Sequence, residues 1–199
     1  MILSGARGGT ARYEVQWRLS RALFFLGQEA GSRESSRQLH SAGIEAGERA
    51  VALNPERVEG HFWVGVNLSL FAGVNRGIRG ARAMRWARSE LKLAGAINER
   101  YHDAGPLRVL GRLEHKAPRI LGGNLKRSRE LFARALEIAP ENSVTLTYAA
   151  ELAIDMGNRD IAVSLLKRMI EAPLDTQWEF ENKRDREIAR LLLDQLSGT

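Results

Sequence analysis

The sequence predicts an all-α fold, a helical-repeat solenoid of about four helix pairs with a C-terminal capping helix. Three observations predict it. The helix formers Ala, Leu, Arg and Glu occur throughout the 199 residues. No segment alternates valine, isoleucine and threonine as a half-buried strand would. Similar helix ends recur about every forty residues, and such repetition is typical of proteins that build their core by stacking one unit.

The recurring helix ends lie at residues 50–56, 94–99 and 135–141, with a weaker copy at 169–173. Their first residues are Ala50, Ala94 and Ala135, which are 44 and then 41 residues apart. A small alanine lets a neighbouring helix approach closely. The proline that follows in two of the copies ends the helix, because it cannot donate the next backbone hydrogen bond.

This pattern resembles the tetratricopeptide repeat, a helix-turn-helix unit with small residues at positions 8, 20 and 27 and proline at position 32. Setting Pro55 and Pro140 at position 32 places alanine at position 27 in both units. Position 8 of the following units then falls on Gly65 and Ala150, and Gly111 takes it in the third unit if the linker after Glu99 is two residues longer. The large apolar position 24 falls on Phe132 and Leu166. The resemblance is good over 122–173, whereas insertions have altered the earlier copies.

From these signals we expect a flexible N-terminus over residues 1–10 and a single domain over 11–199. The predicted helices are 11–28, 37–53, 57–73, 78–98, 105–117, 124–139, 143–156, 159–171 and 178–197. Turns are expected at Gly123-Asn124 and Gly157-Asn158, because glycine and asparagine tolerate left-handed backbone. In the last helix, the apolar residues at helical spacing are Ile188, Leu191, Leu192 and Leu196. They predict one face packed on the solenoid and one face in water.

Composition argues against several function classes. The net charge of +6 suits an anionic partner, but it is modest for a nucleic-acid-binding protein of this size. Five arginines from Arg76 to Arg88 recur every third residue, and this spacing spirals around a helix instead of forming one basic stripe. Cysteine is absent, and the four histidines lack the spacing of a zinc motif. We therefore expect no enzyme activity, no cofactor, no metal site and no nucleic-acid partner.

Two segments go beyond a generic repeat, namely EGHFWVGVNL at 59–68 and YHDAGPLRVLGRL at 101–113. With Ala117-Pro118 and residues 122–124, they resemble the TatT family, the tetratricopeptide component of TRAP transporters. That resemblance covers roughly residues 13–196. It implies a periplasmic, usually lipid-anchored homotrimer with a central pore, which docks the transporter's solute-binding protein. The chain carries no signal peptide and no lipobox cysteine, so the periplasmic location rests on the resemblance and a cytoplasmic location stays open.

The repeat register also predicts a binding groove. In the third unit it places Gly105, Arg108, Arg112, His115 and Lys116 along the concave side. The last four share one helix face, and two guanidinium groups beside a lysine could bind a carboxylate or an acidic partner segment. Glu151 and Asp155 occupy the facing helix. The alternative is that these carboxylates simply pair with the basic residues as a structural network.

Aromatic residues give a second candidate surface. The register places Phe62 toward the groove and Trp63 in the interior, and Tyr101 and His102 precede Pro106 at a helix start, where a binding loop is possible. Two other functions remain open at this stage. One is a carrier for an apolar or anionic small molecule, and the other is a stand-alone adaptor that binds acidic peptide segments.

Overall fold

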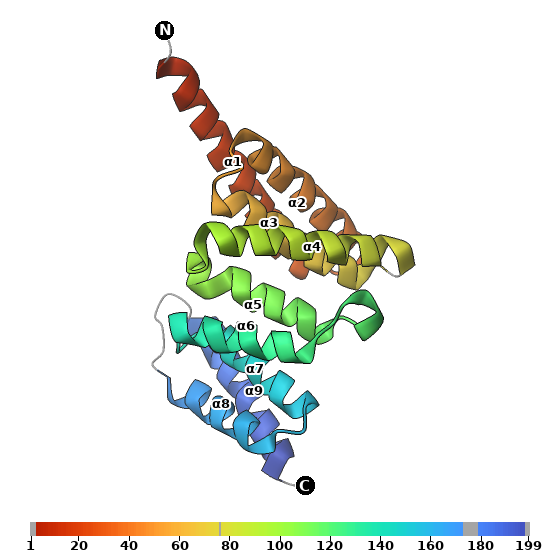
Figure 1. Ribbon diagram of the computed structural model, residues 1–199, viewed down its shortest axis with the longest axis vertical. Helices are drawn as coiled ribbons and strands as arrows, with labels where there is room; N and C mark the ends of the chain where they lie inside the picture. Colours follow the sequence, from red (N-terminus) through yellow and green to blue (C-terminus); the bar gives the residue numbers. More distant parts are fainter. Residues whose placement is uncertain (1–2, 76, 173–178, 198–199) are drawn as a thin grey trace. The chain divides into compact units, whose positions relative to one another are not determined.

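The computed structural model describes the backbone of residues 3–75, 77–172 and 179–197, and the side chains of 9–75, 77–172 and 186–196. Within these ranges every regular element is helical, and the helices stack in pairs (Figure 1). The all-α helical-repeat prediction is confirmed. The elements are α1 Leu3–Gln28, α2 Arg33–Leu53, α3 Val58–Val74, α4 Gly77–Asn98, α5 Tyr101–Lys116, the short 3-10 helix η1 Arg119–Leu121, α6 Leu125–Ile138, α7 Ser143–Asp155, α8 Arg159–Glu171 and α9 Glu179–Ser197.

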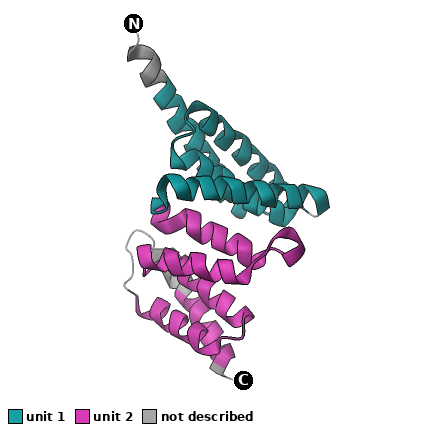
Figure 2. Ribbon diagram, viewed as in Figure 1, with its two compact units in different colours: residues 1–101 teal, residues 102–199 magenta. Residues whose placement is uncertain are grey.

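The chain divides into two compact units, residues 1–101 and 102–199 (Figure 2). In the first unit, α1 packs on α2 and α3, and α3 packs on α4. In the second unit, α7 packs on α6 and α8, and α9 covers α8 and α7. The expected single domain over 11–199 stays a prediction.

Three helices begin well before the residue that the sequence predicts, and one turn lies at a different glycine. Helix α2 begins at Arg33 and not at residue 37, and α5 begins at Tyr101 and not at residue 105. Helix α1 begins at Leu3 and not at residue 11, so it includes most of the segment expected to be a flexible N-terminus. Between α5 and α6, the left-handed residue is Gly122 (φ 86°) and not Gly123, while Asn124 caps α6 by accepting a hydrogen bond from the Arg127 backbone N–H. Gly157 does adopt the expected left-handed backbone (φ 74°).

The helix pairs depend on close approach at repeat position 8. A Cβ at Gly65 would lie 2.7 Å from Cγ of Leu91, and a Cβ at Gly111 would lie 2.7 Å from Cε1 of Phe132. Leu91 and Phe132 both occupy position 24, three residues before the fully buried Ala94 and Ala135. In each pair, the glycine at position 8 of one helix therefore leaves space for the large side chain at position 24 of the other helix.

Helix α9 packs through a different stripe from the one predicted. The residues that pack against α7 and α8 are Ala189, Leu192, Leu193 and Leu196. Ile188 and Leu191 are instead 41% and 59% exposed, so their predicted burial is wrong. The physical reason is a rotation of the packed face by one residue, since Ala189, Leu192, Leu193 and Leu196 follow the i, i+3, i+4, i+7 spacing of a single helix face.

We predict that Gly111→Ala lowers the free energy of unfolding by about 1–3 kcal/mol, because the added methyl group meets the Phe132 ring. Gly73→Ala is the matched control, since a Cβ there meets no atom within 4 Å. The control should raise the free energy of unfolding by up to about 1 kcal/mol through better helix propensity. Urea unfolding of both variants measures the difference, and equal effects would contradict the close-approach explanation.

Candidate functional site

The basic residues of α5 meet two carboxylates of α7 within the second unit. Nη1 of Arg112 lies 2.7 Å from Oε2 of Glu151. The Arg112 guanidinium also lies over the ring of Tyr148, 4.2 Å from its centroid. Lys116 Nζ lies 3.3 Å from Oε2 of Glu151 and 3.3 Å from Oδ2 of Asp155. Arg112, Lys116 and the two carboxylates therefore form one charge network across α5 and α7.

His115 belongs to the same network but is buried. Its side chain is 1% exposed, and its Nε2 lies 2.7 Å from Oδ2 of Asp155. Among the described residues its Nδ1 has no hydrogen-bond partner. Burial lowers the pKa of His115 despite the nearby carboxylate. A neutral ring that donates from Nε2 to Asp155 fits these contacts.

The carboxylates of the network are held in the ionised form. Burial by itself would raise the pKa of Glu151, but hydrogen bonds from Arg112 and Lys116 outweigh it and the pKa falls. The hydrogen bond from His115 lowers the pKa of Asp155, with Lys116 adding to the effect. The four charged groups are thus mutually compensated, as the structural alternative expects.

Arg108 lies one turn before Arg112 but has different partners. It is 7% exposed, and its Nη1 donates to the Asp103 carbonyl oxygen at 2.8 Å. Its Nη2 donates to the His102 carbonyl oxygen at 3.3 Å, and Nη1 lies 3.5 Å from Oδ1 of Asn142, the residue that caps α7. Burial lowers its pKa from the usual value. Arg108 therefore holds the first turn of α5 and does not face solvent as a free anion-binding group.

The first turn of α5 is left-handed. His102, Asp103 and Ala104 have φ values of 52°, 55° and 58°, and the right-handed part of α5 begins only with Gly105 and Pro106. Left-handed backbone costs L-residues roughly 1–2 kcal/mol each, so three in succession need compensation. Arg108 provides it by donating to two carbonyl groups of the turn. Such strain tends to accumulate at functional sites.

The aromatic residues of the first unit form a cluster. Phe62 contacts Trp63 at 5.0 Å and Tyr101 at 5.2 Å between ring centroids, and Trp63 donates from Nε1 to the Tyr101 hydroxyl at 3.2 Å. Phe62 and Trp63 are each 2% exposed. The expectation that Phe62 faces the groove is therefore wrong, because Tyr101 covers it. The interior position expected for Trp63 matches its burial.

A comparison with known protein families identifies the family of the chain. The sequence profile of the TRAP transporter T-component family matches residues 24–197. The chain belongs to the TRAP transporter T-component family. This confirms the resemblance noted in the sequence and associates the chain with a TRAP transporter. No curated protein matches the sequence significantly.

A solved structure supports the fold of this T-component. The crystal structure of a thermophilic TPR protein from Thermus thermophilus matches it with a TM-score of 0.61 and 19% sequence identity. The match covers 95% of this chain and 96% of that chain. At this identity the likeness shows the helical-repeat fold alone.

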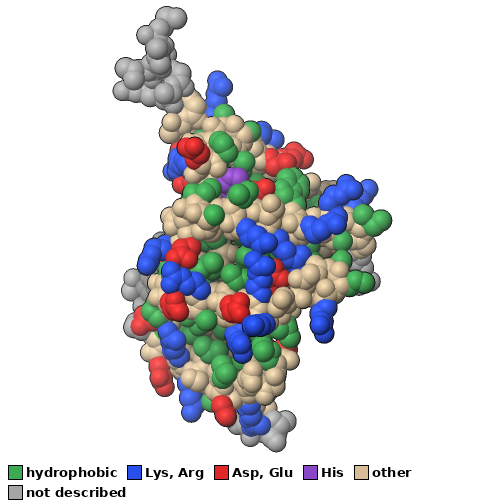
Figure 3. Space-filling view, in the orientation of Figure 1, with side chains coloured by type: hydrophobic (Ala, Val, Ile, Leu, Met, Phe, Trp, Pro, Cys, Tyr) green, Lys and Arg blue, Asp and Glu red, His purple; other side chains and the backbone are tan. Residues whose placement is uncertain are grey.

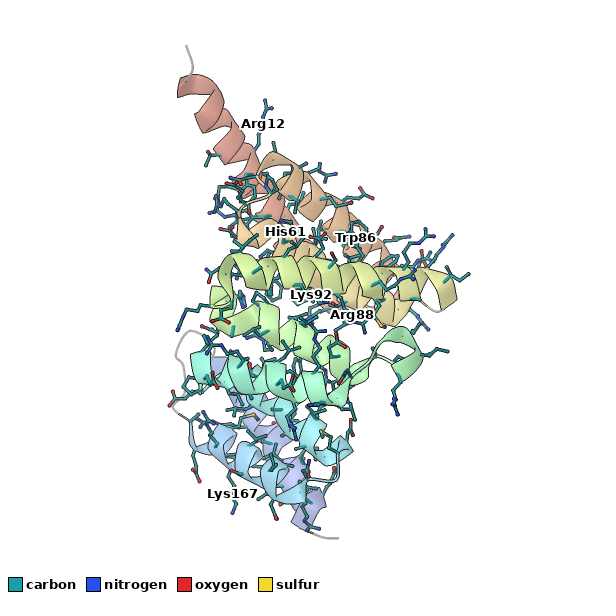
Figure 4. The ribbon with its side chains drawn as sticks, viewed as in Figure 1. Arg12, His61, Trp86, Arg88, Lys92 and Lys167 are labelled. Atoms are coloured by element: carbon teal, nitrogen blue, oxygen red, sulfur yellow. The ribbon has the colours of Figure 1, made fainter. Side chains whose placement is uncertain are left out.

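The arginines of α4 in this T-component do not form a second candidate site. Along α4, Arg79, Arg82 and Arg85 are exposed and Arg88 is half-buried, while Arg76 lies outside the described residues. Basic side chains accordingly cover part of α4 in Figure 3, and Figure 4 labels Arg88 and Lys92 there. Across the described part of the chain, no group of three or more His, Cys, Asp or Glu could hold a metal ion. No described helix is long and apolar enough to cross a membrane.

The sequence did not predict two features, one in each unit. The left-handed turn involves three non-glycine residues, and only the Gly105-Pro106 pair after them signalled a break. The second is His61, whose Nδ1 lies 2.6 Å from Oε2 of Glu90 on α4 and whose Nε2 lies 2.8 Å from the Pro55 carbonyl oxygen. Both ring nitrogens face acceptors, an arrangement that an imidazolium satisfies by donating from each nitrogen. The Glu90 hydrogen bond raises the pKa of His61.

We predict opposite effects for two substitutions in the left-handed turn. Asp103 is exposed, so its replacement tests the backbone and little else. Asp103→Gly should raise the free energy of unfolding by up to about 1 kcal/mol, because glycine adopts left-handed backbone without strain. Asp103→Val should lower it by about 1 kcal/mol or more, because a β-branched side chain opposes this conformation. Chemical unfolding of both variants checks this. A Gly variant no more stable than the Val variant would rule out strain.

The His61 contact should make stability depend on pH. Its folded-state pKa lies above the unfolded value of about 6.5, so the stabilisation is fully present below that pH. It is lost as pH rises through the folded-state pKa. We therefore expect wild type to exceed His61→Gln in unfolding free energy by more at about pH 6 than at about pH 9. A difference that does not change with pH would show that His61 is not charged in the fold.

Proposed function

We propose that this chain is a non-catalytic scaffold that docks the periplasmic solute-binding protein of a TRAP transporter. Membership of the T-component family supports the transporter association. The observation that carries the docking proposal is the charge network of α5 and α7, formed by Arg112, Lys116, Glu151 and Asp155. The periplasmic location and the homotrimer implied by the family resemblance are part of the same proposal.

The charge network favours a folded protein partner over the alternatives. Arg112 and Lys116 already pair with carboxylates, so an acidic peptide would have to displace Glu151 and Asp155. A protein surface that carries charges of both signs can instead extend the network without breaking it, and such complementarity gives specificity. The aromatic cluster does not support a small-molecule carrier, because Phe62 and Trp63 are buried and already contact other rings.

The strained turn offers further exposed groups on the helix that carries the charge network. His102 and Asp103 are exposed and begin the helix that carries Arg112 and Lys116. Arg108, buried beneath them, fixes the turn through two carbonyl groups. In this proposal Arg112, Lys116 and His102 contact the partner, Arg108 and His115 position them, and Phe62 and Tyr101 have packing roles in the first unit.

A charge exchange tests the docking surface while keeping an ion pair between positions 112 and 151; Lys116 loses its contact with Glu151 and keeps the one with Asp155. The double variant Arg112→Glu/Glu151→Arg keeps opposite charges at both positions but reverses their order on the surface. We expect binding to the transporter's solute-binding protein, measured by calorimetry, to weaken about tenfold or more, because complementary charges become repulsive. The matched control exchanges Arg134 and Glu137 of α6, an exposed ion pair with Nη1 and Oε2 2.8 Å apart.

The outcomes separate cleanly. Weaker binding for the α5–α7 exchange and unchanged binding for the α6 exchange, with both variants unfolding like wild type, would support the proposal. Equal binding by all three proteins would remove the charge network from the interface. No binding by wild type would overturn the docking function itself.

A further inference from the structure

The N-terminal helix of the first unit exposes an apolar stripe. Tyr13, Ser20 and Gly27 form the buried face of α1 against α2 and α3. Two residues turn an α-helix by about 200°, so the residues two places after Tyr13 and Ser20 lie on the opposite side. The exposed stripe on that side is formed by Val15, Leu19, Ala22 and Leu26. Helix α1 therefore packs on the unit with one face and exposes apolar residues on the opposite face.

This exposure is substantial and is unusual for a terminal helix. Val15 is 61% exposed, Leu19 41% and Leu26 57%. The outer helix of a repeat array normally carries a polar face, because no further unit covers it. An exposed stripe of large apolar residues on such a helix indicates an interaction surface.

Two charged residues end the stripe. Arg12 precedes Val15 by three residues, and Glu29 follows Leu26 by three residues. Both are exposed, and neither forms an ion pair within the described part of the chain. Arg12 projects from α1 in Figure 4. The backbone N–H of Glu29 still donates to the Phe25 carbonyl oxygen at 3.2 Å, so Glu29 continues the helical turn.

The spacing from Arg12 through the stripe to Glu29 is the same whether it is followed forwards or backwards along the chain. From Arg12 through the four stripe residues to Glu29, the steps are three, four, three, four and three residues. Alternation of three and four is the heptad spacing of a coiled-coil seam. Because the series is symmetric, a second copy running antiparallel places every stripe residue opposite another one.

Charge and size select the antiparallel arrangement. In that register Val15 meets Leu26 of the second copy, Leu19 meets its Ala22, and Arg12 meets its Glu29. Large residues face smaller ones, and both ends of the seam carry opposite charges. A parallel arrangement would place Arg12 against the second copy's Arg12 and Glu29 against its Glu29, and like charges repel.

We propose that a second copy of this chain docks antiparallel on α1 through the stripe, with an Arg12–Glu29 ion pair at each end. The contact is two-fold and isologous, since the same patch is used by both copies. It does not depend on the docking of the solute-binding protein, which involves α5 and α7. Without the trimer of the proposed function, the pairing produces a dimer. With the trimer, it produces a hexamer when the two-fold axis is perpendicular to the three-fold axis and meets it.

The test exploits the two end charges. Arg12→Glu places glutamate at both ends of the seam, and Glu29→Arg places arginine at both ends, so each variant should associate with itself about tenfold more weakly than wild type. Mixing the two variants restores an opposite pair at each end. We expect the mixture to regain the wild-type association, and the double variant Arg12→Glu/Glu29→Arg to regain it alone. Analytical ultracentrifugation over a concentration series measures all four samples.

An apolar variant provides a second measurement. Leu19→Glu should halve the assembly mass, whereas Gln28→Glu, an exposed position off the stripe, should leave it unchanged. Circular dichroism checks that both remain folded. A wild-type mass of one or three chains at every concentration, or a mixture that does not recover, would overturn the pairing. Loss of solute-binding protein affinity in Leu19→Glu without a change of mass would assign the stripe to that partner and overturn it as well. None of these outcomes tests the α5–α7 charge network, so the two proposals fail separately.

Discussion

The close approach of paired helices at one repeat position is the constraint on which the rest of the fold depends. Gly65 and Gly111 leave room for Leu91 and Phe132, whose side chains lie 2.7 Å from where a Cβ would be. In the second pair, Ser128 at the next small position donates from Oγ to the Gly111 carbonyl oxygen at 2.8 Å. Because each helix pair closes in this way, α5 is held near α6, while Arg112 and Lys116 of α5 meet the carboxylates of α7.

The candidate site combines a surface of paired charges with a strained first turn of α5. The cations of α5 have carboxylate partners on α7, so the surface carries a pattern of charge rather than an excess of it. The left-handed turn at the start of α5 costs conformational energy, which the hydrogen bonds of one buried arginine offset. A partner that binds such a face gains specificity from complementary charges and loses little entropy, because the network is already ordered.

The two ends of the first unit differ in chemistry. Its last residue, Tyr101, closes an aromatic cluster with Phe62 and Trp63, whereas α1 leaves Val15, Leu19 and Leu26 in contact with solvent. A repeat array can stop by changing its last helix to a polar surface or by covering it with another chain. The symmetric spacing and end charges of the α1 stripe correspond to the second solution.

The sequence by itself determined the fold class, the family and the small residues that set the helix pairing. The fold class and the small residues follow from composition and periodicity, which depend only on residue type and spacing, and Ala50, Ala94 and Ala135 were correctly identified as packing positions. The family came from the resemblance carried by residues 59–68 and 101–113. It also determined which residues share a face of α5, since a regular helix has one geometry.

Only the tertiary structure decided what those residues contact. Arg108 and Arg112 are four residues apart and equally basic, yet one is buried under a turn and the other pairs with Glu151. Phe62 was expected in a groove and is covered by Tyr101, 39 residues later in the chain. Three non-glycine residues adopt left-handed backbone because Arg108 stabilises it, against their local preference. Long-range packing outweighs local propensity at these positions, and no pattern within a single helix records it.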